Sequence, residues 1–264
     1  MTSKSTASIL SPSDIDFSAL AFGEKKTTPV GASFISLTNN GGPLFLQLPK
    51  IRCFGLNKPY NGGDEDEKKK KYETTLEFKT NEDNSKVKEC LEGLKALEKH
   101  VKDYAKQNSL DLFKKKKMSD DVIDTIFNDF LKPSKDKETG EEDGRAVYFK
   151  FKYPFVKGSE TNFDVGFFDS KKQEVELTVS NINDIVLKNA SVKCVVYPNI
   201  YISSGKFGIT WKVWQMRLWP GEGASNQLNK KVLCMVDSSS DEESEEEEEA
   251  VNNVYNDDDD DDSD

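Results

Sequence analysis

The chain has 264 residues, and only 35% of them are apolar, a share that is low for a wholly globular protein, so part of the chain is expected to remain unfolded. Its net charge of −11 averages two unlike parts. Residues 237–264 hold sixteen of the 48 acidic residues and no Lys or Arg, which leaves 32 acidic and 37 basic residues, a charge of about +5, in residues 1–236. The sequence thus predicts a basic body and a disordered acidic tail.

The cysteines and the single histidine exclude a zinc module, because the four cysteines are far apart, form no C-x-x-C pair, and are accompanied only by His100. We expect the cysteines to be buried free thiols in a reducing compartment. These are Cys53, Cys90, Cys194 and Cys234.

No phosphate loop, nucleophile elbow or metal-ligand spacing is present, so we expect no enzyme activity, no cofactor and no bound metal. The N-terminus does not resemble a signal peptide, and no apolar run approaches a membrane-spanning length of about 20 residues. The expected protein is soluble and intracellular, with no membrane partner.

Residues 1–28 are polar and rich in Ser and Thr, which predicts a loose N-terminal arm whose Phe17, Leu20 and Phe22 could dock on the body. One folded domain is expected over residues 29–236, with charged insertions at 57–71 and 114–144.

Strand-like segments open this domain. Residues 32–37 and 44–48 flank Asn39-Asn40-Gly41-Gly42 and predict a hairpin. Residues 49–55 continue it, with Arg52 and Phe54 on the same face, and residues 72–80 alternate like a half-buried strand.

Two helices are expected next. Apolar residues at three- and four-residue spacing predict a helix over 85–108, capped by Asn84 or Ser85, with His100 on its surface side. The second opens at Ser119 and carries apolar residues as far as Phe130 before Pro133 stops it. Between them, 114–117 are four lysines, which form either a solvated helix end or a phosphate contact. Residues 134–144 are interpreted as a polar linker.

Residues 146–154 predict a strand whose aromatic side chains enter the core on one face, while Tyr148, Lys150 and Lys152 lie on the other. The second face suits one wall of a nucleic-acid groove, although lysines also keep ordinary edge strands soluble. Residues 163–168 and 174–179 predict short strands, and 182–187 a turn or one-turn helix.

Residues 192–219 predict the central hairpin, with a turn at Ser203-Ser204-Gly205. Its second strand carries all three tryptophans among cations, a combination that suits single-stranded nucleic acid because bases stack on rings while cations follow the phosphates. Aromatic residues in strands are more often core residues. We therefore expect two tryptophans to be buried and one, Trp214 or Trp219, to be partly exposed, with a bulge at Val213 and Trp214.

Seven or eight strands, two inserted helices and no regular strand-helix alternation predict a mainly β fold. An antiparallel barrel or sandwich fits this pattern. Among these, an OB-fold-like antiparallel barrel is suited to a protein that binds single-stranded DNA.

Residues 196–202 and 205–211, followed by an acidic tail, resemble the single-stranded-DNA-binding proteins of short-tailed phages and their relatives in large nucleocytoplasmic DNA viruses. The resemblance implies an OB-fold that binds single-stranded DNA without strong sequence preference, and a tail that shields the groove and recruits replication proteins. Phage members end in an aromatic residue, whereas this chain ends Asp262-Ser263-Asp264, so Val254 and Tyr255 are the candidates for tail contacts.

The predicted function is binding of single-stranded DNA in viral DNA replication, recombination or repair. The residues expected to stack on bases are Phe54, Tyr148, Trp214 and Trp219, and those expected to contact phosphates are Arg52, Lys150, Lys152, Lys206, Lys212 and Arg217. Whether RNA is also bound stays open at this point.

The tail is expected to compete with DNA for the groove and to recruit a viral DNA polymerase, helicase or primase. Ser238, Ser239, Ser240 and Ser244 each have an acidic residue three positions on, which favours acidophilic kinases. A homodimer, and a location in the host nucleus, a cytoplasmic viral factory or the virion, fit this role. The alternatives are an acidic chaperone of basic proteins and a structural virion component.

Overall fold

The computed structural model describes residues 8–29, 31–57, 71–80 and 83–221. They lie in the first of two units of the chain, residues 1–231. Most of the 57–71 insertion, Cys234, the acidic tail, the four serines and Val254 and Tyr255 lie outside the described residues.

The described residues form mostly strands, joined by four α-helices and one 3-10 turn. In chain order the elements are β1 (Ile9–Leu10), η1 (Pro12–Asp14), β2 (Leu20–Phe22), β3 (Lys26–Thr27), β4 (Ser33–Asn39), β5 (Gly42–Pro43), β6 (Phe45–Leu56), β7 (Glu73–Lys79), α1 (Ser85–Gln107), α2 (Ser109–Phe113), α3 (Asp120–Ile126), β8 (Phe127–Asn128), β9 (Leu131–Lys135), β10 (Glu142–Lys152), β11 (Gly166–Phe168), β12 (Glu174–Val175), α4 (Ile182–Ile185), β13 (Ser191–Ser203) and β14 (Lys206–Trp219).

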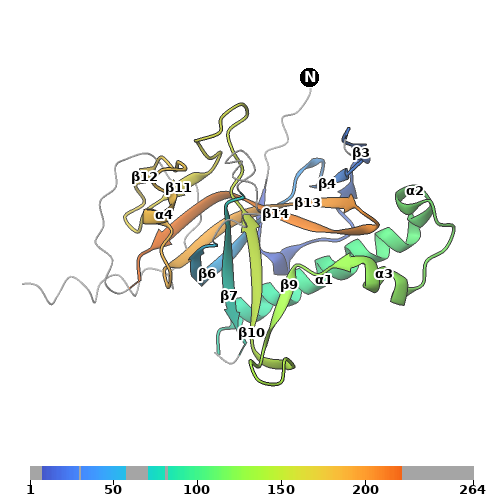
Figure 1. The fold of residues 1–264 in the computed structure, drawn as a ribbon, viewed down its shortest axis with the longest axis horizontal. Helices are drawn as coiled ribbons and strands as arrows, with labels where there is room; N and C mark the ends of the chain where they lie inside the picture. Colours follow the sequence, from blue (N-terminus) through green and yellow to red (C-terminus); the bar gives the residue numbers. More distant parts are fainter. Residues whose placement is uncertain (1–7, 30, 58–70, 81–82, 222–264) are drawn as a thin grey trace, which may run out of the picture. The chain divides into compact units, whose positions relative to one another are not determined.

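Five strands close into a ring in the order β6-β7-β10-β14-β13, and β13 returns to β6. Figure 1 shows β7 beside β10 and β13 beside β14. Numbered along the chain, these ring strands follow one another as 1-2-3-5-4, an arrangement of the OB-fold-like kind. The prediction of a mainly β, OB-fold-like fold is confirmed. The ring is not wholly antiparallel, however, because β10 and β14 run parallel.

Alternation along the ring strands separates an apolar interior from an outer face. Leu76 and Phe78 of β7, Phe149 and Phe151 of β10, and Trp211 of β14 are at most 1% exposed. Cys53, Cys90 and Cys194 are buried free thiols, as predicted. Burial raises the pKa of the Cys90 thiol to about 12, so this sulfur stays protonated and unreactive at neutral pH.

The central hairpin forms as predicted, with β13 and β14 in register from Ser191 and Trp219 to the turn. Ser204 and Gly205 both have positive φ, 51° and 75°, which is the conformation of a two-residue turn that matches the twist of the strands. The predicted bulge is also present, because Val195 pairs with Gln215 while Val196 pairs with Val213, so that Trp214 has no place in the register.

The helical region confirms one prediction and corrects another. Helix α1 begins after Asn84, whose side chain accepts a hydrogen bond of 3.2 Å from the Val87 amide. The second predicted helix, α3, ends at Ile126 instead of continuing to Phe130, because the backbone of Phe127 and Asn128 pairs with Phe207 and Gly208 of β14. The predicted linker 134–144 is also wrong, since β9 and β10 form a hairpin there.

Residues 8–28 do not form a loose arm. Strand β1 pairs with β6 and β2 pairs with β4, and the Phe22 ring stacks on Tyr104 of α1 at 3.5 Å. The predicted docking of Phe17, Leu20 and Phe22 is confirmed, since all three pack against the core. His100 is half-buried rather than at the surface, because the Phe17 and Phe22 rings lie 5.1 and 5.5 Å from it.

None of the helices among the described residues is both long and apolar enough to cross a membrane.

Gly93 of α1 allows the N-terminal segment to reach the helix, because a Cβ there would overlap the Pro12 carbonyl oxygen. Alanine normally stabilises a helix over glycine by about 1 kcal/mol. We predict the opposite for Gly93→Ala, a loss of about 1–3 kcal/mol in the free energy of unfolding, because the clash is with backbone. Urea unfolding measures this. Lys99→Ala, at an exposed position of the same helix, is the control, and a Gly93→Ala variant as stable as the wild type would contradict the contact.

Candidate nucleic-acid interface

The outer face of β7 and β10 carries a row of cations beside an aromatic ring. Register places Tyr148 next to Glu77 and Lys152 next to Glu73. Glu73 forms ion pairs with Lys150 at 3.2 Å and with Lys152 at 3.8 Å. These are the second and third strands of the ring, and this is the face through which OB-folds bind oligonucleotides.

The ring closes beside this row. Strands β10 and β14 pair where Lys152 lies next to Lys212, so closure itself brings two like charges together. Burial is the main reason that the pKa of Lys152 is lowered, and the positive charges of Lys71, Lys150 and Lys212 lower it further, against the attraction of Glu73. A phosphate at this point would relieve the repulsion among the lysines.

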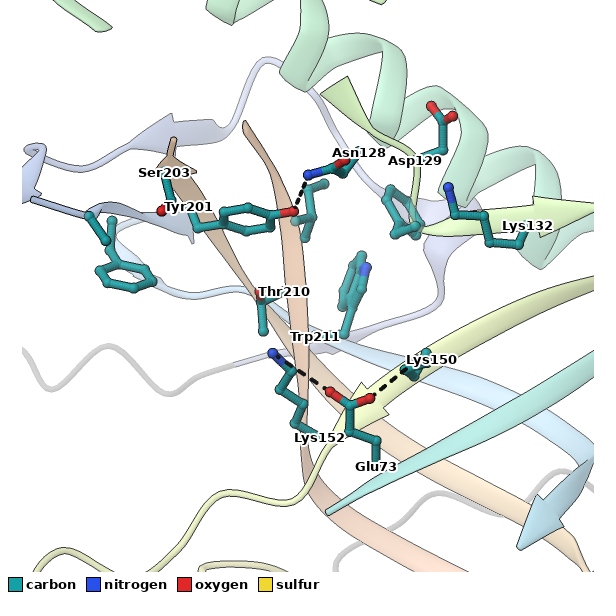
Figure 2. Close-up of a pocket in the computed structure, with 14 residues that line it drawn as sticks. Glu73, Asn128, Asp129, Lys132, Lys150, Lys152, Tyr201, Ser203, Thr210 and Trp211 are labelled. Carbon is teal, nitrogen blue, oxygen red and sulfur yellow. Dashed lines mark hydrogen bonds and ion pairs between the residues drawn. The ribbon is translucent and has the colours of Figure 1, made fainter. Parts of the chain in front are cut away.

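On the N-terminal side of Lys212, strand β14 pairs with β8 instead of β10, at Phe207 and Gly208. A pocket of about 500 Å³ lies in this region. Figure 2 shows Lys150 and Lys152 on either side of Glu73, with Tyr201, Thr210 and Trp211 across from them. The lining residues are Ala32, Phe34, Glu73, Asn128, Asp129, Phe130, Lys132, Lys150, Lys152, Tyr201, Ser203, Ile209, Thr210 and Trp211.

Aromatic side chains face the lysines across the pocket. Phe34 of β4 and Tyr201 of β13 are directly opposite each other in the register, and the Phe34 side chain is 42% exposed. Asn128 donates a hydrogen bond of 2.7 Å to the Tyr201 hydroxyl, which fixes the position of that ring (Figure 2). Exposed rings beside cations can stack on bases while the ammonium groups hold phosphates.

Three lysines and two carboxylates line the pocket. Both carboxylates already have cationic partners, since Glu73 is paired as described and Asp129 lies 3.4 Å from the Lys102 amine. Lys132 is exposed and lies next to Tyr148 in the register of β9 and β10. The pocket and Lys212 together are therefore cationic, as an anion site requires.

The structure brings together several residues that the sequence predicts for the site. Tyr148, Lys150, Lys152 and Lys212 lie on one continuous outer surface. Phe54 joins them, because its ring lies 5.6 Å from that of Tyr148.

Arg52 lies beside Phe54, and its guanidinium is 5.4 Å from that ring. It also forms an ion pair of 3.0 Å with Glu77 and donates a hydrogen bond of 2.6 Å to Asn189. Arg52 is exposed, so a phosphate could reach it, but only in competition with these two partners.

Arg217 is not part of this surface. It is 3% exposed, donates a hydrogen bond to the Ser170 carbonyl oxygen, and lies in a part of β14 that pairs with both β11 and β13. The prediction that it contacts phosphate is therefore wrong, because its side chain is buried and its guanidinium is bonded to the backbone. Trp219 is half-buried, with Lys50 and Arg217 over its ring at 4.5 and 4.4 Å, so cations already occupy the surface that a base would need.

Of the three tryptophans, all within the described residues, only Trp211 is fully buried, so the prediction of two buried tryptophans is wrong. Trp214 is 39% exposed and lies on the other side of Lys212 from the pocket residues. Lys206 is exposed at the tip of the hairpin and does not line the pocket.

Phe34, Lys132 and Tyr201 line the pocket but are not among the predicted site residues. Alternation could have identified two of them, because Phe34 stands beside the buried Ile35 and Tyr201 beside the buried Ile200, so each points to the opposite face of its strand. Lys132 gives no such signal, since its position depends on the pairing of β9 with β10.

No protein-family model matches the chain, and no curated protein matches it. Among solved structures, the single-stranded-DNA-binding protein of bacteriophage Enc34 with a C-terminal truncation is 14% identical over 80% of this chain and 98% of that one, with a TM-score of 0.39. The Enc34 protein in complex with single-stranded DNA is 12% identical over 77% and 92%, with a TM-score of 0.37.

The single-stranded-DNA-binding protein gp2.5 of bacteriophage T7 is 12% identical over 70% of this chain and 98% of that one, with a TM-score of 0.40. At such identities and TM-scores the function has to be inferred from the side chains of this protein itself. These solved structures are single-stranded-DNA-binding proteins of bacteriophages.

Proposed function

We propose that this protein binds single-stranded DNA on the outer face of β7 and β10 and in the adjoining pocket. The observation that carries the proposal is the surface on which Lys150, Lys152 and Lys212 lie together, flanked by the exposed ring of Phe34 and the half-buried ring of Tyr201. Bases stack on the rings, and the lysines hold the phosphates between them. Both contacts are indifferent to base identity, so binding is largely without sequence preference.

The acidic tail has a role in this proposal. Its sixteen carboxylates are tethered to a body of opposite charge, so they compete with phosphates for the same lysines. Action in viral DNA replication, recombination or repair, and recruitment of replication proteins through Val254 and Tyr255, complete the proposal and rest on the resemblance of the sequence.

Reversing the charge of the lysine pair tests the surface. We predict that Lys150→Glu with Lys152→Glu lowers the affinity for oligothymidine by at least about tenfold, because the attraction of two lysines for phosphate becomes repulsion. The salt dependence of log K should also become shallower by about 0.7 for each phosphate that is no longer neutralised. Fluorescence anisotropy at several salt concentrations measures both quantities.

The matched control is Lys95→Glu with Lys99→Glu, the same change of charge on two exposed lysines of α1. If the control weakened binding as much as the Lys150 and Lys152 variant, net charge rather than this surface would hold the DNA.

Phe34→Ala tests stacking. The side chain is 42% exposed, so its removal should hardly affect stability, whereas the loss of one stacked base should cost about 1–3 kcal/mol of binding free energy. The loss should be similar for oligothymidine and oligocytidine. Leu110→Ala, at a 57% exposed apolar position of α2, is the control. Unchanged affinity in Phe34→Ala would remove this ring from the interface.

Truncation after Val236 tests the tail. We predict that the truncated protein binds single-stranded DNA more tightly than the full chain, with the difference largest at low salt, because screening weakens the competition by the tail. Anisotropy titrations with duplex DNA as competitor measure this. If neither form bound DNA while the tail alone captured polycationic proteins, the chain would act as an acidic chaperone instead.

A further inference from the structure

A second group of aromatic side chains lies outside the ring, on the opposite side of Lys212 from the pocket. The Phe45 ring of β6 is 4.7 Å from the Trp214 ring of β14 and 5.8 Å from the Tyr197 ring of β13. Phe45 and Tyr197 are half-buried, and Trp214 is 39% exposed. None of these three rings is fully buried in the core. We call Phe45, Tyr197 and Trp214 together the aromatic platform.

Trp214 points outward from β14 at a bulge. In the register, Val195 lies opposite Gln215 and Val196 opposite Val213, and both Val213 and Gln215 are buried. Trp214 is the extra residue between them, and it points outward. Bulges occur where a strand has to aim one side chain differently from its neighbours, often beside a functional site.

Lys212 connects the platform to the pocket. It lies next to Lys152 of β10 on one side and next to Tyr197 of β13 on the other. Two interstrand steps separate Lys152 from Tyr197, a distance of about 10 Å. A chain of phosphates can therefore follow the lysines across β14 and arrive at the second group of rings.

One carboxylate limits the route. The charge of Asp164 adds to burial in raising the pKa of the Tyr197 hydroxyl, so Asp164 lies close enough to repel a phosphate on that side. We therefore expect the phosphates to lie next to the Lys212 amine and the bases to stack on the aromatic rings.

We infer that a single strand of DNA crosses β14 at Lys212 and stacks bases at two places, on Phe34 and Tyr201 in the pocket and on the platform of Phe45, Tyr197 and Trp214. This inference rests on the proposed function and extends it. The strand runs across the ring strands, and the platform is reached only by a ligand long enough to span Lys212.

The test uses the full-length protein and oligothymidines of about 4 to 16 nucleotides, the range of site sizes known for OB-folds. Trp214→Ala should leave the affinity for the shortest oligonucleotides unchanged and lower it about fivefold or more for the longer ones. Phe34→Ala should weaken binding at every length. Trp214→Phe should keep the affinity, because it keeps a ring, and Val122→Ala, at a 38% exposed position of α3, is the control.

Tryptophan fluorescence gives a second readout. Trp211 is buried and Trp219 lies under two cations, so quenching by a stacked base should come from Trp214, appear only with the longer oligonucleotides and vanish in Trp214→Phe. Equal affinity of Trp214→Ala and wild type at every length, or quenching that persists in Trp214→Phe, would overturn the inference and leave the proposed function in place.

Two other outcomes would also overturn the inference. Absence of DNA binding by the wild type and by the form that ends at Val236 would remove the proposed function as well. Self-association that Trp214→Ala abolishes, with unchanged DNA affinity, would assign the platform to a contact between two copies of the chain.

Discussion

The ring closes where Lys152 of β10 lies beside Lys212 of β14, and both the fold and the site depend on this parallel contact. Because β10 pairs with β14 only at Lys212, the backbone of Phe207 and Gly208, earlier in β14, needs another partner, and β8 supplies it. The same limited pairing leaves the region that the pocket occupies. Closure therefore produces two things at once, a group of neighbouring lysines and an opening lined with rings beside them.

Bringing these lysines together disfavours the charged form of Lys152. Burial and mutual repulsion both lower the pKa of Lys152, and Glu73 offsets only part of this effect. Such an arrangement adds little to stability, since burial of Lys152 and repulsion among the lysines oppose the attraction of Glu73. Two aromatic residues near the lysines also contribute little to the core, because Phe34 is 42% exposed and Trp214 is 39% exposed. Charge and exposed rings together are better explained by a ligand than by folding.

Local sequence patterns predicted much of this molecule. Alternation identified the outward face of Tyr148, Lys150 and Lys152, and the break in alternation at Trp214 identified the bulge. The errors have a common cause, which is pairing between distant segments. Arg217 is buried in the part of β14 that pairs with both β11 and β13, and α3 stops at Ile126 because β14 recruits the next two residues. Phe34 and Tyr201 meet only because β4 pairs with β13, which nothing in their local sequence indicates.

Glu73 can be regarded as a counterion that is attached to the fold. A free cation or anion displaced by a ligand escapes into solution and gains entropy. The carboxylate of Glu73, once displaced from Lys150 and Lys152, stays within reach of both amines and can return. A single phosphate gains little from such an exchange. A chain of phosphates, held by Lys212 and Lys132 as well, could keep the carboxylate displaced, so we expect such a site to favour polymers over free nucleotides.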